Sequence, residues 1–163
     1  MTYEELLEGI RRILNIDVGK LKHEKGFNFV YKDDLVVTLE PAPGRDGFYH
    51  LYSPVCDLPS DRAMCEDLYQ MLMQGHLFGY GTNNNYFGID KKRNKVFMFK
   101  LMNLEKMSLD AFQAKLTRFL AAEEFWRERF RDPRKYLEAE ARLEKENVSP
   151  DDPDFVKRFH QYV

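Results

Sequence analysis

Apolar residues occupy both faces of every strand that the sequence predicts. Strands are expected at 27–31, 35–40, 48–55, 86–90 and 95–101, each bounded by turn-forming residues. Within the first of them, Phe27, Phe29 and Tyr31 share one face, while Val30 lies on the other. An antiparallel sheet with one face in water normally alternates apolar and polar residues. We therefore expect helices of this chain to cover one face and a partner to cover the other.

Helical periodicity separates and follows these strands. A first helix is predicted to about residue 15, a second over 62–74 after Asp61, and a long third one after Ser108. Residues 134–147 are charged on most faces and predict an exposed helix. The order is helix, three strands, helix, two strands, long helix and helical extension. This order predicts an α+β fold with an antiparallel sheet.

The chain is predicted to contain one domain and a C-terminal extension. Its 163 residues suffice for a single hydrophobic core. We place the domain at 1–131 and a helical extension at 132–163, because Asp132-Pro133 ends the third helix. The last nine residues of the extension contain five apolar ones: Phe155, Val156, Phe159, Tyr162 and Val163. We expect this segment to pack on its own domain or across a dimer, because so many apolar residues are costly to hydrate; the alternative is recruitment of another protein.

Charge and composition argue against several partners. The formal charge is −2, from 25 basic and 27 acidic residues, so the chain offers no net basic field for nucleic acid or an anionic membrane. The basic turn Lys91-Lys92-Arg93-Asn94-Lys95 could bind a single strand, but a solvated hairpin tip with ordinary charges is the favoured interpretation, given Asp90 and the nearly neutral domain. No apolar run has the length of a membrane span, and no signal peptide is evident. We expect a cytoplasmic protein.

The sequence offers little for catalysis. Its candidate groups are Cys56 and Cys65 together with four histidines, namely His23, His50, His76 and His160. A Cys–His pair would need a third orienting group, and the sequence contains no nucleophile elbow, phosphate loop or zinc-ligand spacing. We therefore predict that the protein is not an enzyme and uses no cofactor or metal.

Several short sequence motifs, in the order in which they occur, resemble those of the class I type III secretion chaperones, the Tir-chaperone family. The similar words are Tyr3-Glu4-Glu5-Leu6-Leu7, the strand–turn–strand at 27–40, Leu51-Tyr52-Ser53-Pro54, Leu72 to Gly79, Phe87-Gly88-Ile89-Asp90, and Phe112, Leu116, Phe119 and Trp126-Arg127 in the closing helix. The resemblance covers about residues 1 to 130. The chain departs from the family pattern in His76, in Asn84-Asn85, in its nearly neutral charge and in its C-terminal extension.

The resemblance implies a homodimer in the bacterial cytoplasm that binds the N-terminal chaperone-binding region of a secreted effector without ATP. The effector would lie extended against apolar patches on the sheet and on the outward flank of the first helix. An alternative is a regulatory or generic protein-interaction module with the same fold, because a fold does not dictate function.

Two sets of site residues follow from these expectations. The effector-binding set holds strand positions expected to face away from the helices: Phe29, Tyr31, Val37, Leu39, His50 and Tyr52. Packing of these residues beneath the helices is the alternative. The dimer set lies where the resemblance implies an interface, on the second helix and the next strand: Tyr69, Leu72, Met73, Leu77, Phe87 and Ile89. The second helix is apolar on two sides, which favours burial on two sides.

Overall fold

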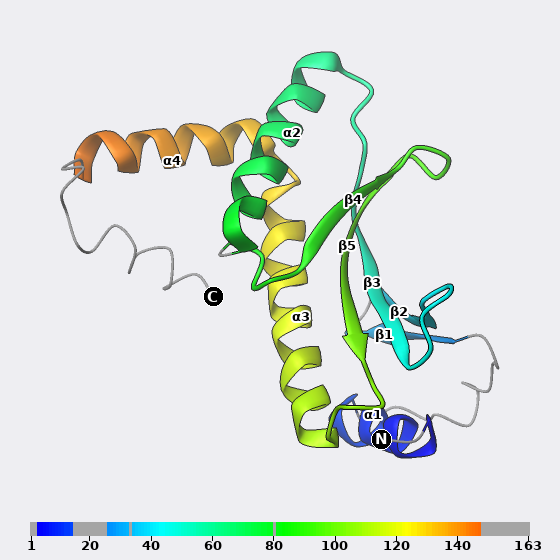
Figure 1. Ribbon diagram of the computed structural model, residues 1–163. Coiled ribbons are helices and arrows are strands. Elements are labelled where there is room, and N and C mark those ends of the chain that lie inside the picture. The colour runs from blue at the N-terminus through cyan, green and yellow to red at the C-terminus, as the bar shows by residue number, and fades with distance from the viewer. Residues whose placement is uncertain (1–2, 15–25, 33, 80, 148–163) are drawn as a thin grey trace.

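The computed structural model describes residues 3–14, 26–32, 34–79 and 81–147 (Figure 1). The elements in chain order are α1 (Tyr3–Leu14), β1 (Phe27–Tyr31), β2 (Leu35–Pro41), β3 (Phe48–Asp57), α2 (Arg62–His76), the 3-10 turn η2 (Leu77–Gly79), β4 (Tyr86–Asp90), β5 (Lys95–Asn103), α3 (Leu109–Arg129) and α4 (Pro133–Asn147). The predicted α+β fold is confirmed.

The five strands form one antiparallel sheet in the order β1-β2-β3-β5-β4. Only β1 and β4 are edge strands. The register pairs Leu39 with Leu51 and Ser53 with Met98, and it pairs Phe87 with the same Met98. Because paired residues in an antiparallel ladder point to the same side, all five residues lie on one face of the sheet.

That face and the helices α1 and α3 enclose the hydrophobic core. The sheet contributes Val37, Leu39, Leu51 and Met98, all with no exposed surface. Helix α3 contributes Phe112, Leu116 and Phe119, and α1 contributes Leu6 and Ile10, which are equally buried. Figure 1 shows α3 running along the sheet and α1 at its lower end. Two helices of the same chain therefore cover one of the two faces.

Side-chain caps fix where α2 and α3 begin. A carboxylate oxygen of Asp61 accepts a hydrogen bond from the backbone N–H of Met64 at 2.9 Å, and the hydroxyl of Ser108 accepts one from Ala111 at 3.2 Å. Each cap satisfies an amide that has no partner within its helix. Both helices start where the sequence predicts.

Helices α2 and α3 approach closely at Gly75. A Cβ atom there would lie 2.4 Å from the ring of Trp126, so only glycine fits. The indole Nε1 of Trp126 donates to the carbonyl of Gly81 at 2.9 Å, and its ring meets Phe87 edge-on at 5.3 Å. One tryptophan therefore joins α2, the loop after it, β4 and α3.

Helix α4 is added to this domain after the turn at Asp132. Its first turns pack on α2 and α3, where Arg134 bonds to Asp67 at 3.0 Å and the ring of Tyr136 lies 6.3 Å from that of Trp126. The rest of the helix points away from the sheet (Figure 1). Residues 149–153 and 155–163, for which a linker and an apolar segment are predicted, lie outside the described residues.

Candidate partner-binding surfaces

The second face of the sheet has no helix packed on it in the part of the chain that the structure describes. It carries the residues that alternate with the core positions: Val36 and Thr38 on β2, His50, Tyr52 and Pro54 on β3, Phe97, Phe99 and Leu101 on β5, and Tyr86 on β4. At the β1–β2 edge Val30 is 51% exposed and Val36 is 41% exposed. We call these residues together the open sheet face.

Aromatic rings form a row across the open sheet face. The rings of Tyr52 and Phe97 meet edge-on at 5.9 Å, and those of His50 and Phe99 meet at 6.4 Å. The ring of Phe99 lies 5.6 Å from that of Tyr86 on the edge strand. Cross-strand aromatic pairs of this kind, direct or diagonal, stabilise a sheet and give it an apolar surface.

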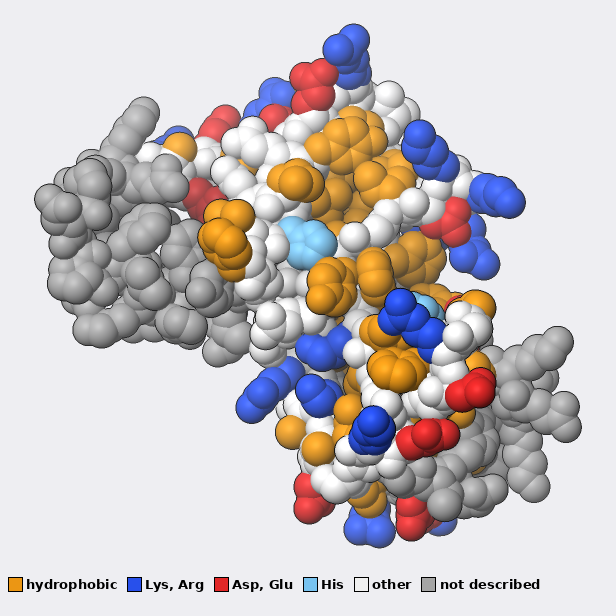
Figure 2. All heavy atoms as spheres, viewed as in Figure 1, with side chains coloured by type: hydrophobic (Ala, Val, Ile, Leu, Met, Phe, Trp, Pro, Cys, Tyr) orange, Lys and Arg blue, Asp and Glu red, His pale blue; other side chains and the backbone are white. Residues whose placement is uncertain are grey.

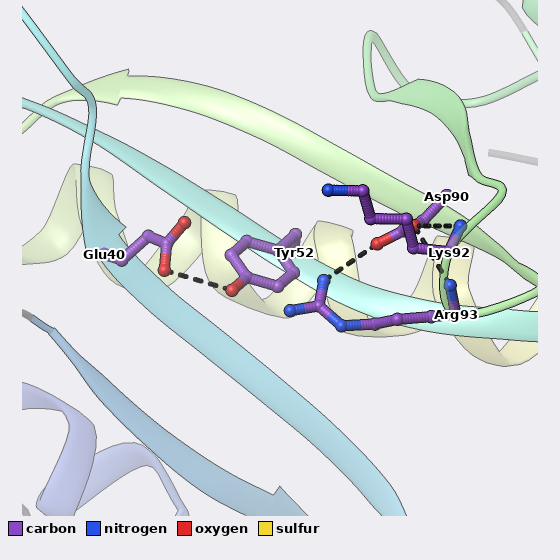
Figure 3. Close-up of polar contacts among 5 residues, drawn as sticks. All are labelled: Glu40, Tyr52, Asp90, Lys92 and Arg93. Atoms are coloured by element: carbon purple, nitrogen blue, oxygen red, sulfur yellow. Dashed lines mark hydrogen bonds and ion pairs between the residues drawn. The ribbon is translucent and has the colours of Figure 1, made fainter.

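Polar groups flank Tyr52 within this row. Figure 3 shows Tyr52 between Glu40 and Arg93, with α3 behind the strands. The Tyr52 hydroxyl donates to Glu40 at 3.1 Å, and burial, followed by the charge of Glu40, raises the pKa of Tyr52. The side chain therefore stays a neutral hydrogen-bond donor at neutral pH.

Ion pairs occupy the basic turn beside the open sheet face. Asp90 accepts hydrogen bonds from the backbone of Lys92 and Arg93 and from the Arg93 guanidinium (Figure 3). These contacts, led by the Arg93 N–H, lower the pKa of Asp90. Lys95 pairs with Asp57 in the same way. Two of the basic groups are thus matched locally by carboxylates, which weakens the field that the turn offers to a nucleic acid.

The effector-binding set predicted from the sequence falls on both faces of the sheet. His50 and Tyr52 lie on the open sheet face. Phe29, Val37 and Leu39 are core residues, and Tyr31, on their face, packs partly against the core. The prediction that these four face away from the helices is wrong. The error arises from the strand register, which the sequence does not give. Leu39 pairs with Leu51 and therefore lies on the core face, whereas Thr38 beside it pairs with Tyr52 on the open sheet face.

The outward flank of α1, which is expected to bind the effector, is charged where its side chains are described. Within the described side chains it carries Glu8, Arg11 and Arg12, with Glu8 and Arg11 forming an ion pair at 3.6 Å. The apolar residues Leu6 and Ile10 point into the core. The part of α1 whose side chains are described thus offers a charged surface to solvent.

The dimer set divides between surface and core. Tyr69, Met73, Leu77 and Ile89 are exposed, with Met73 at 72%. Leu72 is buried, and the ring of Phe87 contacts Trp126 and Phe130 inside the domain. Figure 2 shows hydrophobic side chains gathered between α2 and the β4–β5 hairpin and again over the strands below. We call the four exposed residues the α2 surface.

The α2 surface and the open sheet face adjoin at His76. Its imidazole ring lies 5.4 Å from the ring of Tyr86 and 6.3 Å from that of Phe87. The two predicted sets of site residues left out five exposed apolar residues: Val30, Val36, Met64, Phe78 and Tyr86. Strand alternation would have found Val30 and Val36 once the register of a single core residue was known.

Burial raises the pKa of two titratable side chains in the interior, Glu123 and Cys56. Glu123 on α3 is fully buried, neither of its carboxylate oxygens has a hydrogen-bond partner, and burial raises its pKa to about 8. Burial, with Asp57 and Glu123 as further causes, raises the pKa of the Cys56 thiol to about 12. A thiol with such a pKa stays protonated at neutral pH and is a poor nucleophile.

Neither a reactive Cys65 thiol nor a metal site is indicated within the described residues. The Cys65 thiol donates to the carbonyl of Pro59 at 3.0 Å. Among the described residues, no three His, Cys, Asp or Glu side chains are grouped so that they could hold a metal ion. No helix in the described ranges is long and apolar enough to span a membrane. What remains as functional surface is apolar and suited to binding a polypeptide.

Comparisons with known proteins agree with this geometry. The sequence model of the Tir chaperone protein (CesT) family matches residues 5–127. No curated protein matches the chain. Among solved structures, the HopA1–SchA chaperone–effector complex matches with a TM-score of 0.60 and 19% identity, over 77% of this chain and 93% of that chain.

Two further structures have the same fold. The type III secretion chaperone SycH of Yersinia pestis, in complex with a stable fragment of YscM2, matches with a TM-score of 0.56 and 17% identity, over 77% of this chain and 99% of that one. The ExoT–SpcS complex of Pseudomonas aeruginosa matches with a TM-score of 0.55 and 10% identity, over 76% and 96%.

Proposed function

Because the chain belongs to the Tir chaperone protein (CesT) family, we propose that it is a type III secretion chaperone that binds the N-terminal segment of a secreted effector. The observation that carries this proposal is the open sheet face, an aromatic row flanked by exposed valines. The HopA1–SchA and ExoT–SpcS structures, which are complexes of relatives in fold, support an effector as the partner.

Burial of apolar surface would supply the binding energy. At ~25 cal/mol per Å², covering ~1,000 Å² of apolar surface gives a large favourable gross contribution. Ordering a disordered effector segment offsets about 2–5 kcal/mol of it or more. The edge strands β1 and β4 could add main-chain hydrogen bonds to an extended segment. Such binding is reversible and needs no ATP, which suits a protein that must release its cargo.

The α2 surface supports a homodimer as the working state. A C2 dimer uses the same patch on both copies, and Tyr69, Met73, Leu77 and Ile89 form a patch that is apolar in all its members. The proposal includes a cytoplasmic location, no cofactor and no catalytic activity. The protonated thiol of Cys56 supports the last of these, because it is poorly suited to nucleophilic attack.

Co-expression tests the function directly. The tagged chain is expressed in a host with a type III apparatus, and its partners are identified by mass spectrometry. We expect a secreted protein that is retained through its first hundred or so residues. Recovery of a transcription factor alone would favour the regulatory alternative, and retention by an RNA alone would contradict the proposal.

A surface charge tests where the effector binds. Val36→Asp places a carboxylate on the open sheet face, where docking of an apolar segment would bury it. We expect the affinity for the recovered effector segment to fall at least tenfold in calorimetric titrations. The matched control is Ala121→Asp, an exposed position on α3 away from the sheet, which should bind normally. Equal affinities of both variants would place the effector elsewhere.

A further inference from the structure

Three basic side chains lie close together where β5 passes the middle of α3. Lys100 on β5 is paired in the strand ladder with the buried Leu51, so its side chain points to the helix-covered face of the sheet. Lys115 and Arg118, one turn apart on α3, act on the Lys100 ammonium as neighbouring charges. Figure 2 shows Lys and Arg side chains gathered at this level, with no Asp or Glu side chain among them on the face shown. We call the three residues the basic cluster.

Neutral groups alone hold the Lys100 ammonium in the domain. Its Nζ donates to the carbonyl of Asn83 at 3.1 Å and to that of Asn84 at 3.4 Å, and it donates to Asn85 Oδ1 at 3.1 Å. Burial, followed by the positive charges of the two α3 residues, lowers the pKa of Lys100. A partly buried cation is usually paired with a carboxylate, because removing its charge from water is costly. Within the described residues Lys100 has no such pair.

The two α3 members of the basic cluster also lack a carboxylate. Neither Lys115 nor Arg118 forms an ion pair in the part of the chain that the structure describes. Apart from the pair itself, the positions three and four residues from each of them hold only alanine and phenylalanine. Carboxylates at those positions would reach the two cations, and like charges one turn apart destabilise a helix. The repulsion within the basic cluster therefore has no compensation on its own helix.

A buried hydrogen-bond donor beside the basic cluster is unused. The Asn85 side chain is 1% exposed, and its Nδ2 has no hydrogen-bond partner among the described residues. Because Nδ2 belongs to the same amide group as Oδ1, which accepts from Lys100, it lies next to the ammonium. Buried polar groups normally find a partner. The site thus combines cations without an anion and an N–H without an acceptor, and a carboxylate complements both.

The size and the place of the basic cluster favour a polypeptide over a nucleic acid. Nucleic-acid binding gains its strength from many phosphate contacts, whereas the cluster has three cations in a chain of net charge −2. Asn85 directly precedes β4, an edge strand that pairs only with β5 in the described sheet. An extended peptide that runs along this edge would bring its side chains to the basic cluster.

From these observations we infer that Lys100, Lys115 and Arg118 form a site for the carboxylates of an acidic segment of the bound polypeptide. This inference rests on the proposed function for the identity of that polypeptide, because it assigns the partner chemistry of the same effector. Ion pairs at the basic cluster add selectivity to the apolar binding on the open sheet face, which accepts any apolar segment of suitable shape.

The first test uses poly-L-glutamate, labelled with fluorescein and titrated with the full chain at low ionic strength, where exposed charges are least screened. Lys115→Gln/Arg118→Gln, the α3 variant, removes two of the three charges. Its matched control, Lys91→Gln/Lys92→Gln, removes two charges from the basic turn. We expect the dissociation constant to rise about tenfold for the α3 variant and less than about twofold for the control. Equal losses in both variants would reflect net charge alone and overturn the inference.

Thermal unfolding separates a binding role from a structural one. The α3 variant should unfold at the wild-type midpoint or above it, because it removes side chains that repel Lys100 and form no ion pair. Poly-L-glutamate should raise the midpoint of wild type but not that of the α3 variant, since a ligand stabilises only a state that binds it. A midpoint of the α3 variant well below that of wild type would assign the two side chains to the fold and overturn the inference.

The remaining outcomes distinguish this inference from the proposed function. An effector segment, once recovered by co-expression, should bind the α3 variant about tenfold more weakly than wild type. Equal affinities overturn the inference and leave the proposed function intact. Absence of any secreted partner contradicts the proposed function, while selective loss of poly-L-glutamate binding in the α3 variant would still support the acidic site. Tighter binding of polyuridylate than of poly-L-glutamate would assign the basic cluster to nucleic acid and overturn the inference.

Discussion

Among the described residues, Glu123 is the acidic side chain that the fold buries completely. Its carboxyl group is fully buried between α3 and the sheet, and neither oxygen has a hydrogen-bond partner. Against the effect of burial, Ser53 on β3 and Arg127 act to lower the pKa of Glu123. The Ser53 hydroxyl, however, donates to the carbonyl of Val36 at 2.8 Å. The Arg127 guanidinium, one turn along α3, is engaged by Asp34 at 2.7 Å. Burial therefore dominates and keeps the group protonated at neutral pH.

This protonation makes stability depend on pH. Burial raises the pKa of Glu123 from its ordinary value of 4.5 to about 8 in the folded protein. Between these two pH values Glu123 is ionised in the unfolded chain and protonated in the folded protein. The free energy of unfolding therefore falls as the pH rises, by about 1.4 kcal/mol per pH unit. Glu123→Gln removes this dependence. We expect the variant to gain stability over wild type from pH 5 to pH 8, as measured by urea unfolding at each pH.

Comparing wild type with Glu123→Gln isolates the effect of the Glu123 carboxyl group, because all other titrating residues are common to both proteins. Glu124→Gln serves as the control, since Glu124 is adjacent in the chain and only partly buried. Its difference from wild type should not grow over the same pH range. Parallel pH profiles for wild type and Glu123→Gln would show that the buried carboxyl is ionised or solvated in the folded protein.

At the scale of elements, the close approach of α2 and α3 decides the geometry of the functional surface. Gly75 permits it, because any side chain there would overlap Trp126. Trp126 also donates to the loop after α2 and contacts Phe87 on β4. The position of the α2 surface relative to β4 thus depends on one glycine and one tryptophan.

Gly75→Ala tests this contact. Its Cβ atom would meet the Trp126 ring at 2.4 Å, and a ring packed on several sides cannot yield without cost. We expect a loss of about 1–3 kcal/mol in the free energy of unfolding, as is usual for overpacking, although alanine is the better helix former. Gln74→Ala, at the exposed neighbouring position, should change stability by less than about 0.5 kcal/mol. Chemical denaturation would measure both, and equal stabilities would contradict the tight contact.

For the whole molecule, the division into a domain and an extension is open to a direct test. The matched family segment ends at residue 127, before α4 begins. We propose that residues 1–131 fold alone. Truncation after Arg131 should retain cooperative unfolding and lose about 1–3 kcal/mol, because the packing of Tyr136 and Leu137 on the core is removed. Loss of the cooperative transition would show that α4 belongs to the domain.

A shorter truncation addresses the apolar end of the chain. Removal of residues 149–163 leaves α4 in place and deletes the segment that holds Phe155 and Phe159. If that segment packs on its own domain or across the dimer, as the sequence predicts, the thermal midpoint should fall. An unchanged midpoint together with loss of a partner would instead assign the segment to recruitment.

Much of the fold could be predicted because the signals are local. Apolar runs bounded by turn-forming residues marked the strands, Asp61 and Ser108 marked helix starts, and Asp132-Pro133 marked the end of α3. The exposed members of the α2 surface could also be predicted, since Tyr69, Met73 and Leu77 recur at helical spacing. Phe78 could not, because a left-handed backbone conformation at a phenylalanine leaves no signature in the sequence.

The sequence by itself determined the order of elements and the fact that both faces of the sheet are apolar, because strand periodicity and caps are encoded within a few residues. Only the tertiary structure decided which face stays open. That choice depends on the pairing of Leu39 with Leu51 and on where α1 and α3 pack. These are contacts between distant segments, and a shift of the strand register by one residue exchanges the two faces.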